Sequence, residues 1–300
     1  MFFIGLINSL FSFITFQNKE LRKVGCGIHL LMSSITSLIT ISIVTVKFFF
    51  VLFTHIDIKY VHPSIISGGC ISIEPLVKLF VFLDGWLNAC VAIERTIQVF
   101  HGTSFNKEKS TRVARWVILL LPFGIMGTII HEPIYRRIFR TKGFKPFITT
   151  DKHEKKFWCL TRYSPVIQTY NTIILFFHLV APCIINLFSA LFIIIQVTRQ
   201  RSIVQQKLTY KEHFRQQLYE NKHLLISSIT LLLLALPRLI ISMLSTCTEA
   251  TQNPWLYLSS YFIAFIPSIL IFTIFVVPST LYMKTFKQSI NTYRRYICRQ

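Results

Sequence analysis

Long stretches of the chain carry no charge. No Asp, Glu, Lys or Arg occurs in residues 1–18, 24–46, 116–131, 163–198 and 250–283, and residues 224–246 hold only Arg238. A hydrocarbon core of about 30 Å needs about 20 apolar residues in helical form. A soluble helix would instead carry polar residues on one face. The runs therefore predict membrane-spanning helices.

One further span is less apolar. Residues 70–95 hold Glu74, Lys78, Asp84, Glu94 and Arg95 among apolar residues. Charged side chains within a membrane usually face the protein interior or a cavity, so we expect this helix to lie at the centre of the others. The pattern predicts an all-α, single-domain bundle of residues 1–300, with seven spans at about 1–16, 24–53, 70–98, 113–132, 166–197, 224–247 and 255–282.

The first of these spans is short. Its residues 1–16 rise only about 24 Å as a helix. A signal peptide would have basic residues before its apolar core and a small-residue cleavage site after it. Here Lys19, Arg22 and Lys23 follow the apolar run and no such site is present. We therefore expect a membrane span that lacks its outer half.

Composition supports a membrane protein and excludes other classes. Apolar residues make up 52% and charged residues 15% of the chain, with a mean hydropathy of +0.53, whereas ordinary globular chains are about 25% charged. Disordered chains lack such apolar content. The net charge of +20 resides in loops on both sides of the predicted bundle, so nucleic acid is not an expected partner.

The loop charges also predict an orientation. The basic segments 17–23, 99–112, 198–223 and 283–300 are cytoplasmic by the positive-inside rule, which puts the N-terminus outside and the C-terminus inside a plasma membrane. The segment 133–165 would lie outside although it carries nine Lys and Arg residues, more than any of these four segments, so this loop opposes the assignment.

The third span carries chemistry at both ends. Cys70 lies near its outer end and Glu94-Arg95 at its inner end, 25 residues further on, which is about 37 Å of helix and one membrane crossing. The next outer loop contains Trp158-Cys159. No zinc-ligand spacing and no Gly-rich nucleotide motif is present in the sequence, so we expect no metal and no cofactor. No cluster of His, Asp and Glu can be assembled at one membrane level either, so we expect no enzymatic activity.

This arrangement resembles the rhodopsin-like family of G-protein-coupled receptors over nearly the whole chain. The resemblance implies a disulfide between Cys70 and Cys159, which an oxidising outer compartment permits; the alternative is two free thiols. It also implies that Glu94 and Arg95 form a switch that is closed when inactive and that releases Arg95 toward a heterotrimeric G protein. The alternative is two charges snorkelling at the membrane boundary.

Other positions match the family or depart from it. Asn8 corresponds to the conserved Asn of the first helix, and helix hinges are implied at Pro182, Pro237 and Pro278. The departures are Thr96 after the Arg, Ala235 before Pro237, Val277 before Pro278, a displaced Tyr282, and Thr36 near the usual acid of the second helix. They affect the sodium site and the activation switches, and they are typical of a divergent member, similar to lineage-expanded orphan receptors of invertebrates.

Charges inside the predicted spans suggest a ligand pocket. Lys47, Lys78 and Arg238 fall in the outer halves of three spans, and deep charges are by default functional candidates. Facing inward, they would bind an anionic ligand bearing a carboxylate or phosphate; a peptide is also compatible. The alternatives are snorkelling of Lys47, an i,i+4 pair of Lys78 with Glu74, and hydrogen bonds from Arg238 to helix carbonyls.

Two further features remain. Asp84, midway along the third span, is a candidate ion or proton site, or else a protonated carboxyl bonded to a buried partner. The tail 283–297 repeats apolar residues at helical spacing among basic ones, which predicts an amphipathic helix on the lipid bilayer, with Cys298 as a candidate palmitoylation site.

A receptor is the leading interpretation of the whole chain. A transporter or channel is the alternative, although no internal repeat is visible.

Overall fold

The computed structural model describes residues 2–56, 63–141, 156–161, 163–204, 272–277 and 279–297, together with Leu233, Leu236 and Ile240. Pro237, Arg238, Pro278 and Cys298 lie outside the described residues, as do almost all of the predicted sixth span and most of the seventh.

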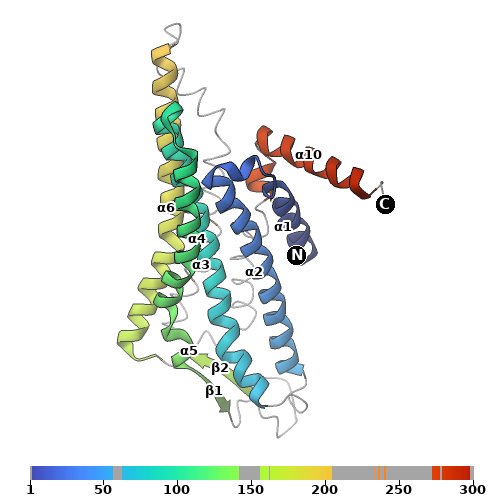
Figure 1. Ribbon diagram of the computed structural model, residues 1–300. Coiled ribbons are helices and arrows are strands. Elements are labelled where there is room, and N and C mark those ends of the chain that lie inside the picture. Colours follow the sequence, from blue (N-terminus) through green and yellow to red (C-terminus); the bar gives the residue numbers. More distant parts are fainter. Residues whose placement is uncertain are drawn as a thin grey trace.

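The described part is a bundle of long helices (Figure 1). Its elements are α1 (Phe2–Phe16), η1 (Leu21–Lys23), α2 (Gly25–Ile56), α3 (Pro63–His101), η2 (Gly102–Ser104), α4 (Lys107–Ile129), α5 (His131–Tyr135), α6 (Pro165–Val204), the π-helix η4 (Phe272–Val276) and α10 (Thr280–Ile297). Within the described residues, four segments are long and apolar enough to cross a membrane: Gly25–Phe50, Ser67–His101, Lys107–Tyr135 and Pro165–Gln200. Helix α1 is a shorter apolar helix.

Several helices extend beyond the spans that hydropathy predicts. Helix α3 begins at Pro63 rather than near residue 70, and α6 continues to Val204 rather than ending near 197. Proline is well suited to the first turn of a helix, because the N–H that it lacks would have no intrahelical partner there. The last turns of α6 contain polar residues and continue the helix past the apolar run. Hydropathy reports only the part of a helix that crosses the lipid, so it underestimates the length of the helix.

Helix α3 lies at the centre of the described bundle, in contact with α2, α4 and α6. Its residues Leu79, Phe82, Leu83 and Leu87 form the largest buried apolar cluster, together with Ile125 and Ile129 of α4 and Leu175 of α6. The outward faces remain apolar: Leu120 and Phe123 of α4 are 60% and 71% exposed. Apolar side chains on both faces of a helix are typical of a membrane bundle.

One element was not predicted. Strands β1 (Arg136–Thr141) and β2 (Lys156–Thr161) form an antiparallel hairpin in which Ile138 pairs with Cys159. The sequence predicted only helices, with the segment 133–165 as a loop. Charge and hydropathy mark this segment as lying outside the membrane, but strand pairing depends on satisfying its backbone groups, which neither quantity reports.

Candidate functional site: charged groups at the two ends of the bundle

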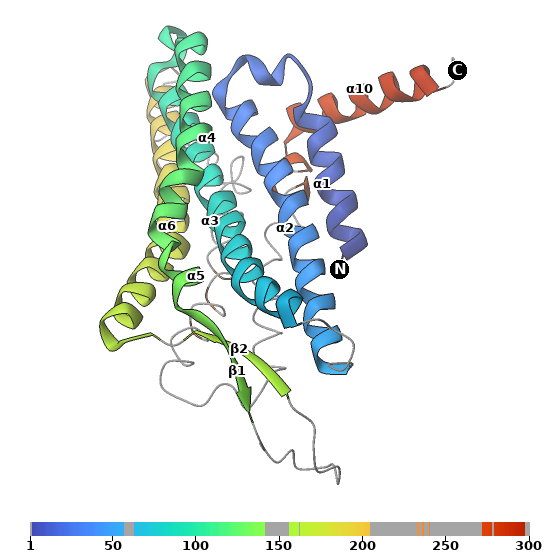
Figure 2. The same cartoon turned by 60° about the horizontal axis from the view of Figure 1, so that its bottom comes forward.

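The bundle has two chemically distinct ends. The hairpin lies at one end, beyond the first turns of α3, whereas α10 leaves the opposite end, near the last turn of α1 (Figures 1 and 2). We refer to them as the hairpin end and the α10 end. The long central helix α3 connects them, since it carries Cys70 in its first half and Arg95 near its last turn.

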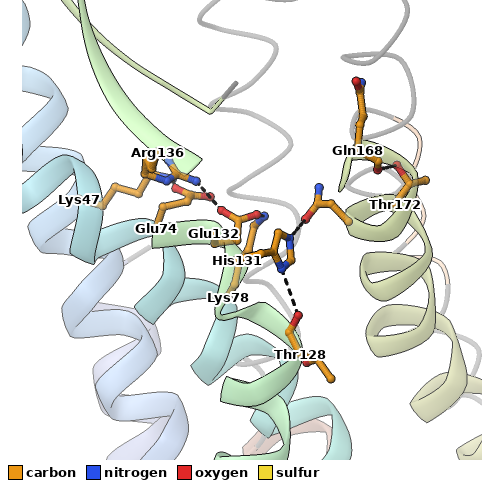
Figure 3. Close-up of polar contacts among 10 residues, drawn as sticks. Lys47, Glu74, Lys78, Thr128, His131, Glu132, Arg136, Gln168 and Thr172 are labelled. Atoms are coloured by element: carbon orange, nitrogen blue, oxygen red, sulfur yellow. Dashed lines mark hydrogen bonds and ion pairs between the residues drawn. The ribbon is translucent and has the colours of Figure 1, made fainter. Parts of the chain in front are cut away.

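Five charged side chains from four elements gather at the hairpin end (Figure 3). This hairpin-end charge cluster consists of Lys47 of α2, Glu74 and Lys78 of α3, Glu132 of α5 and Arg136 of β1. Lys47 pairs with Glu74, and Lys78 pairs with Glu132. Arg136 donates to the second oxygen of Glu132 at 2.7 Å. Glu132 is only 1% exposed, so the cluster ties the hairpin to α3 through a buried carboxylate.

The cluster corrects one of the sequence-based alternatives. Lys78 does not form the i,i+4 pair with Glu74, because Lys47 from the neighbouring helix occupies that carboxylate. Glu132 and Arg136 were missed as site residues. Glu132 is the first acid after the uncharged run 116–131, but nothing in the sequence indicates which lysine it meets. Arg238, the third predicted pocket residue, lies outside the described residues.

A second set of polar contacts starts at His131, the residue before Glu132. His131 Nε2 lies 3.2 Å from Oδ1 of Asn171, and its Nδ1 lies 3.2 Å from the carbonyl oxygen of Thr128. Tyr170 donates to the same carbonyl at 3.1 Å. In Figure 3 the side chain of His131 points toward Thr128, and His131 directly precedes Glu132 in the sequence. These contacts join the end of α4 to α6 beside the charge cluster.

His178 of α6 links three helices at mid-bundle. The indole N–H of Trp86 on α3 donates to His178 Nδ1 at 2.9 Å, and His178 Nε2 lies 2.9 Å from Oγ1 of Thr128 on α4. An indole N–H can only donate, so Nδ1 accepts and the imidazole proton is on Nε2, facing Thr128. Both nitrogens are thus used in interhelical hydrogen bonds. No group of three or more His, Cys, Asp or Glu side chains capable of holding a metal occurs in the described part of the chain.

Asp84 is buried at the interface of α2 and α3. Its Oδ1 accepts a hydrogen bond from Ser33 Oγ at 2.6 Å, and the residue is 4% exposed. One turn further along α3, Asn88 is 5% exposed and its Oδ1 accepts no hydrogen bond from the described residues. The Ser33 contact suits either a carboxylate or a protonated carboxyl, so the ion or proton site at Asp84 stays a prediction.

At the α10 end, Arg95 is held by a neutral partner. Its guanidinium donates to Tyr282 Oη at 3.1 Å and lies over the Tyr282 ring, 5.7 Å from the centroid. Cys26 Sγ of α2 is 4.0 Å from the same hydroxyl. Tyr282 belongs to the first turn of α10 and packs against Phe16 of α1. Three elements therefore meet around the arginine of α3.

Glu94 has a different set of partners. It accepts a hydrogen bond from Ser110 of α4, and Ser110 Oγ in turn accepts from the backbone N–H of Gly25 at 3.2 Å. Among the described residues, Glu94 and Arg95 form no ion pair within 4.0 Å. The closed pair that the resemblance implies is thus not the arrangement seen here. Ser110 and Gly25 were missed by the sequence, in which they are ordinary residues at helix ends.

The predicted disulfide and the proline of α6 can be placed in part. Cys70 is disulfide-bonded and 3% exposed. The backbone of Cys159 lies in β2, whose partner strand β1 contacts α3. The Cys159 side chain is outside the described set, so the Cys70–Cys159 pairing stays a prediction.

Pro182 lies within α6 at its approach to α3, where its ring carbons come within 3.8 Å of a Cβ built on Gly85.

These observations define a multi-pass helical membrane protein with buried polar groups at both ends of its bundle. The model of the 7 transmembrane receptor (rhodopsin family) matches residues 7–271, which is most of the chain. The protein therefore belongs to the rhodopsin family of seven-transmembrane receptors, a family of signal-transducing receptors and not of enzymes. A search of the curated proteins found no match to the chain.

Proposed function

We propose that the protein is a G-protein-coupled receptor that binds a ligand at the hairpin end and activates a heterotrimeric G protein at the α10 end. The observation that carries the proposal is the environment of Arg95. This arginine lies at the end of the central helix and is bonded to Tyr282 of another element rather than to the acid beside it. A hydrogen bond to a neutral hydroxyl can be exchanged for a bond to a partner protein at modest cost.

The proposed orientation puts the α10 end in the cytoplasm. Helix α10 supports this, because its exposed residues include Lys284, Lys287, Arg294 and Arg295, whereas Phe286 packs against Phe11 and Phe272. Basic groups on an amphipathic helix suit an anionic inner leaflet. Palmitoylation of Cys298, the residue directly after this helix, would strengthen the attachment.

The proposed mechanism is a population shift. A ligand that prefers one packing of the bundle shifts the receptor toward it. Pro182 weakens α6, since a proline inside a helix leaves the carbonyl four residues earlier, that of His178, without its usual backbone donor. Bending at Pro182, and at Pro237 and Pro278 of the later spans, would open the region of Arg95 to the G protein.

The proposed ligand carries a carboxylate or phosphate. The hairpin-end charge cluster supports this with three cations, Lys47, Lys78 and Arg136, around the carboxylates of Glu74 and Glu132. Because both lysines already have carboxylate partners, an anionic ligand group would act by replacing one of them. Unchanged agonist potency in Lys78→Ala and Arg238→Ala receptors at the cell surface would exclude this ligand class and favour an uncharged group or a neutral peptide.

The test of the receptor function uses the full chain reconstituted in lipid vesicles. Ligand-library fractions are screened for nucleotide exchange on a panel of purified heterotrimeric G proteins, and solute flux is recorded from the same vesicles. We expect ligand-dependent exchange that Arg95→Ala abolishes, whereas Arg112→Ala, at an exposed arginine of α4, retains it. Flux without exchange would instead establish the transporter or channel.

A further inference from the structure

The first turn of α2 contacts the partners of both Glu94 and Arg95. Gly25 donates its backbone N–H to Ser110, whose hydroxyl donates to Glu94. Cys26, the next residue, lies 4.0 Å from the Tyr282 hydroxyl that accepts from Arg95. Two consecutive residues of one helix therefore reach the partners of two consecutive residues of another. This arrangement directs the acid toward α4 and the base toward α10.

Gly25 is required for the close approach of Glu94. A Cβ on Gly25 would lie 2.8 Å from both carboxylate oxygens of Glu94 and 2.9 Å from Cβ of Ala114 on α4. No side chain larger than hydrogen fits between these groups without a shift of Glu94 or of α4. The carboxylate consequently lies against the N-terminus of α2, where backbone N–H groups lack intrahelical partners and the helix dipole favours negative charge.

Ser110 connects the carboxylate to that helix end. Its hydroxyl donates to Glu94 and accepts from Gly25, so both of its hydrogen-bonding functions are used. The neighbouring Thr111 hydroxyl shares its one proton between the carbonyl of Lys107 in its own helix, at 2.9 Å, and that of Lys23, at 3.2 Å, so it also links the start of α4 to the chain entering α2. A hydrogen bond to an ionised carboxylate is about twice as strong as one between neutral groups, so this contact can compete with an ion pair.

If Ser110 no longer donates to Glu94, we expect the carboxylate to turn toward the guanidinium of Arg95, the adjacent residue, because a charged donor binds a carboxylate more strongly than a neutral one. We infer that Ser110 and Gly25 are positioning residues, which hold the Glu94 carboxylate at the α2 N-terminus and so keep it from pairing with Arg95. Arg95 then remains bonded to Tyr282, in the arrangement from which it meets a G protein. The part of this inference that concerns coupling rests on the proposed function; the part that concerns the location of Glu94 does not.

The first experiment measures agonist-free nucleotide exchange in membranes, per receptor at the surface. Ser110→Ala is expected to lower exchange about tenfold, the effect of losing one hydrogen bond to a charged group, because Glu94 then captures Arg95. Ser110→Thr keeps the hydroxyl and is expected to stay near the wild-type rate. Ser42→Ala, at an exposed serine of α2 that bonds only its own helix, is the matched control.

The decisive variant combines Ser110→Ala with Glu94→Gln. A neutral amide cannot form an ion pair with Arg95, so the double variant is expected to recover the exchange rate of Glu94→Gln alone. If Ser110 only supported the fold, removing the charge of Glu94 would not restore exchange. Wild-type exchange in Ser110→Ala, or no recovery in the double variant, would overturn the inference.

A second experiment does not depend on a G protein. Thermal unfolding of the purified receptor is measured for Ser110→Ala, Glu94→Gln and both together, and we expect non-additive shifts in Tm because the two side chains share a hydrogen bond. Gly25→Ala is expected to lower Tm, whereas Gly124→Ala on α4, where a Cβ meets nothing within 4 Å, is not. Additive shifts would overturn the location of Glu94. Coupled shifts in a receptor that activates no G protein would support that location and contradict the proposed function.

Discussion

The charged side chains of α3 have charged partners at the hairpin end of the bundle and neutral partners at the α10 end. At the hairpin end, Lys78 and Glu132 are 54 positions apart in the sequence and pair directly, with Arg136 on the other carboxylate oxygen. At the α10 end, Glu94 and Arg95 are adjacent in the sequence, yet each is bonded to a neutral partner. Distance along the chain therefore does not decide which charged side chains form a pair. The pairing depends on the rotation of each helix and on the groups packed beside that helix.

The difference has an energetic consequence. Breaking a buried ion pair leaves an uncompensated charge and costs about 3–5 kcal/mol. A hydrogen bond between a charged and a neutral group contributes about 1.5–3 kcal/mol, and between neutral groups about 1 kcal/mol. The hairpin end is thus suited to hold one packing, and the α10 end is suited to exchange partners. Receptor signalling needs both, since a rigid part must transmit a change to a part that can rearrange.

The largest effect is expected for Glu132→Ala at the hairpin end. Two cations, Lys78 and Arg136, would lose their shared buried carboxylate. We expect a loss of about 3–5 kcal/mol in the free energy of unfolding, measured on the purified receptor in detergent. Glu20→Ala is the matched control, because its pair with Lys23 is 74% and 63% exposed and exposed pairs contribute little. Equal losses in the two variants would remove the contrast between the ends.

A smaller effect is expected for Lys47→Met. The Glu74 carboxylate would lose its direct partner but would still experience the positive charges of Arg136 and Lys78. We expect a loss of about 2 kcal/mol by the same measurement, between a hydrogen bond to a charged group and a complete buried pair. Lys19→Met, at an exposed lysine, serves as the control. A loss as large as that of Glu132→Ala would mean that Lys47 alone neutralises Glu74.

The membrane spans and some residues of the candidate site could be predicted from the sequence. The uncharged runs predicted three of the four long apolar segments of the described residues, because a membrane requires consecutive apolar residues whatever the fold. The fourth, Ser67–His101, was predicted from residues 70–95 in spite of their charges. Cys70, Glu94 and Arg95 were singled out because their types and spacing match a known family, and the match of residues 7–271 confirms that family. These signals are local or depend on spacing along a single helix.

The partners of those residues could not be predicted in the same way. Whether Glu74 meets Lys47 or Lys78 depends on the rotation of α2 against α3, and both choices satisfy the sequence pattern equally. Gly25 contributes through its lack of a side chain, and Ser110 through one hydroxyl. Neither produces a hydropathy or charge signal. The hairpin was missed because its pairing depends on backbone groups that every sequence shares.

The hydrogen bonds by which His178 joins α6 to α3 and α4 give an intermediate prediction. Trp86→Phe keeps an aromatic ring but removes the N–H that donates to His178, which leaves a buried acceptor without its partner. We expect a loss of about 1–2 kcal/mol in the free energy of unfolding. Trp116→Phe, at a tryptophan that is 58% exposed on α4, is expected to be close to neutral. A change in Trp116→Phe of the same size would attribute the loss to the indole ring and not to the hydrogen bond.

A similarly modest effect on stability, and the most informative effect on signalling, is expected for Tyr282→Phe. The variant keeps the ring beneath Arg95 but removes the hydroxyl that accepts from it. We expect the free energy of unfolding to fall by about 1.5 kcal/mol, the lower bound for a hydrogen bond to a charged group, while agonist-free nucleotide exchange changes about tenfold, since about 1.4 kcal/mol is a factor of ten in an equilibrium constant. Tyr135→Phe, at an exposed tyrosine of the hairpin end, is expected to alter neither. A loss of stability comparable to that of Glu132→Ala, with no change in exchange, would show that the α10 end is as rigid as the hairpin end. Arg95 would then be a structural arginine, and the difference between the two ends would lie in their partners alone.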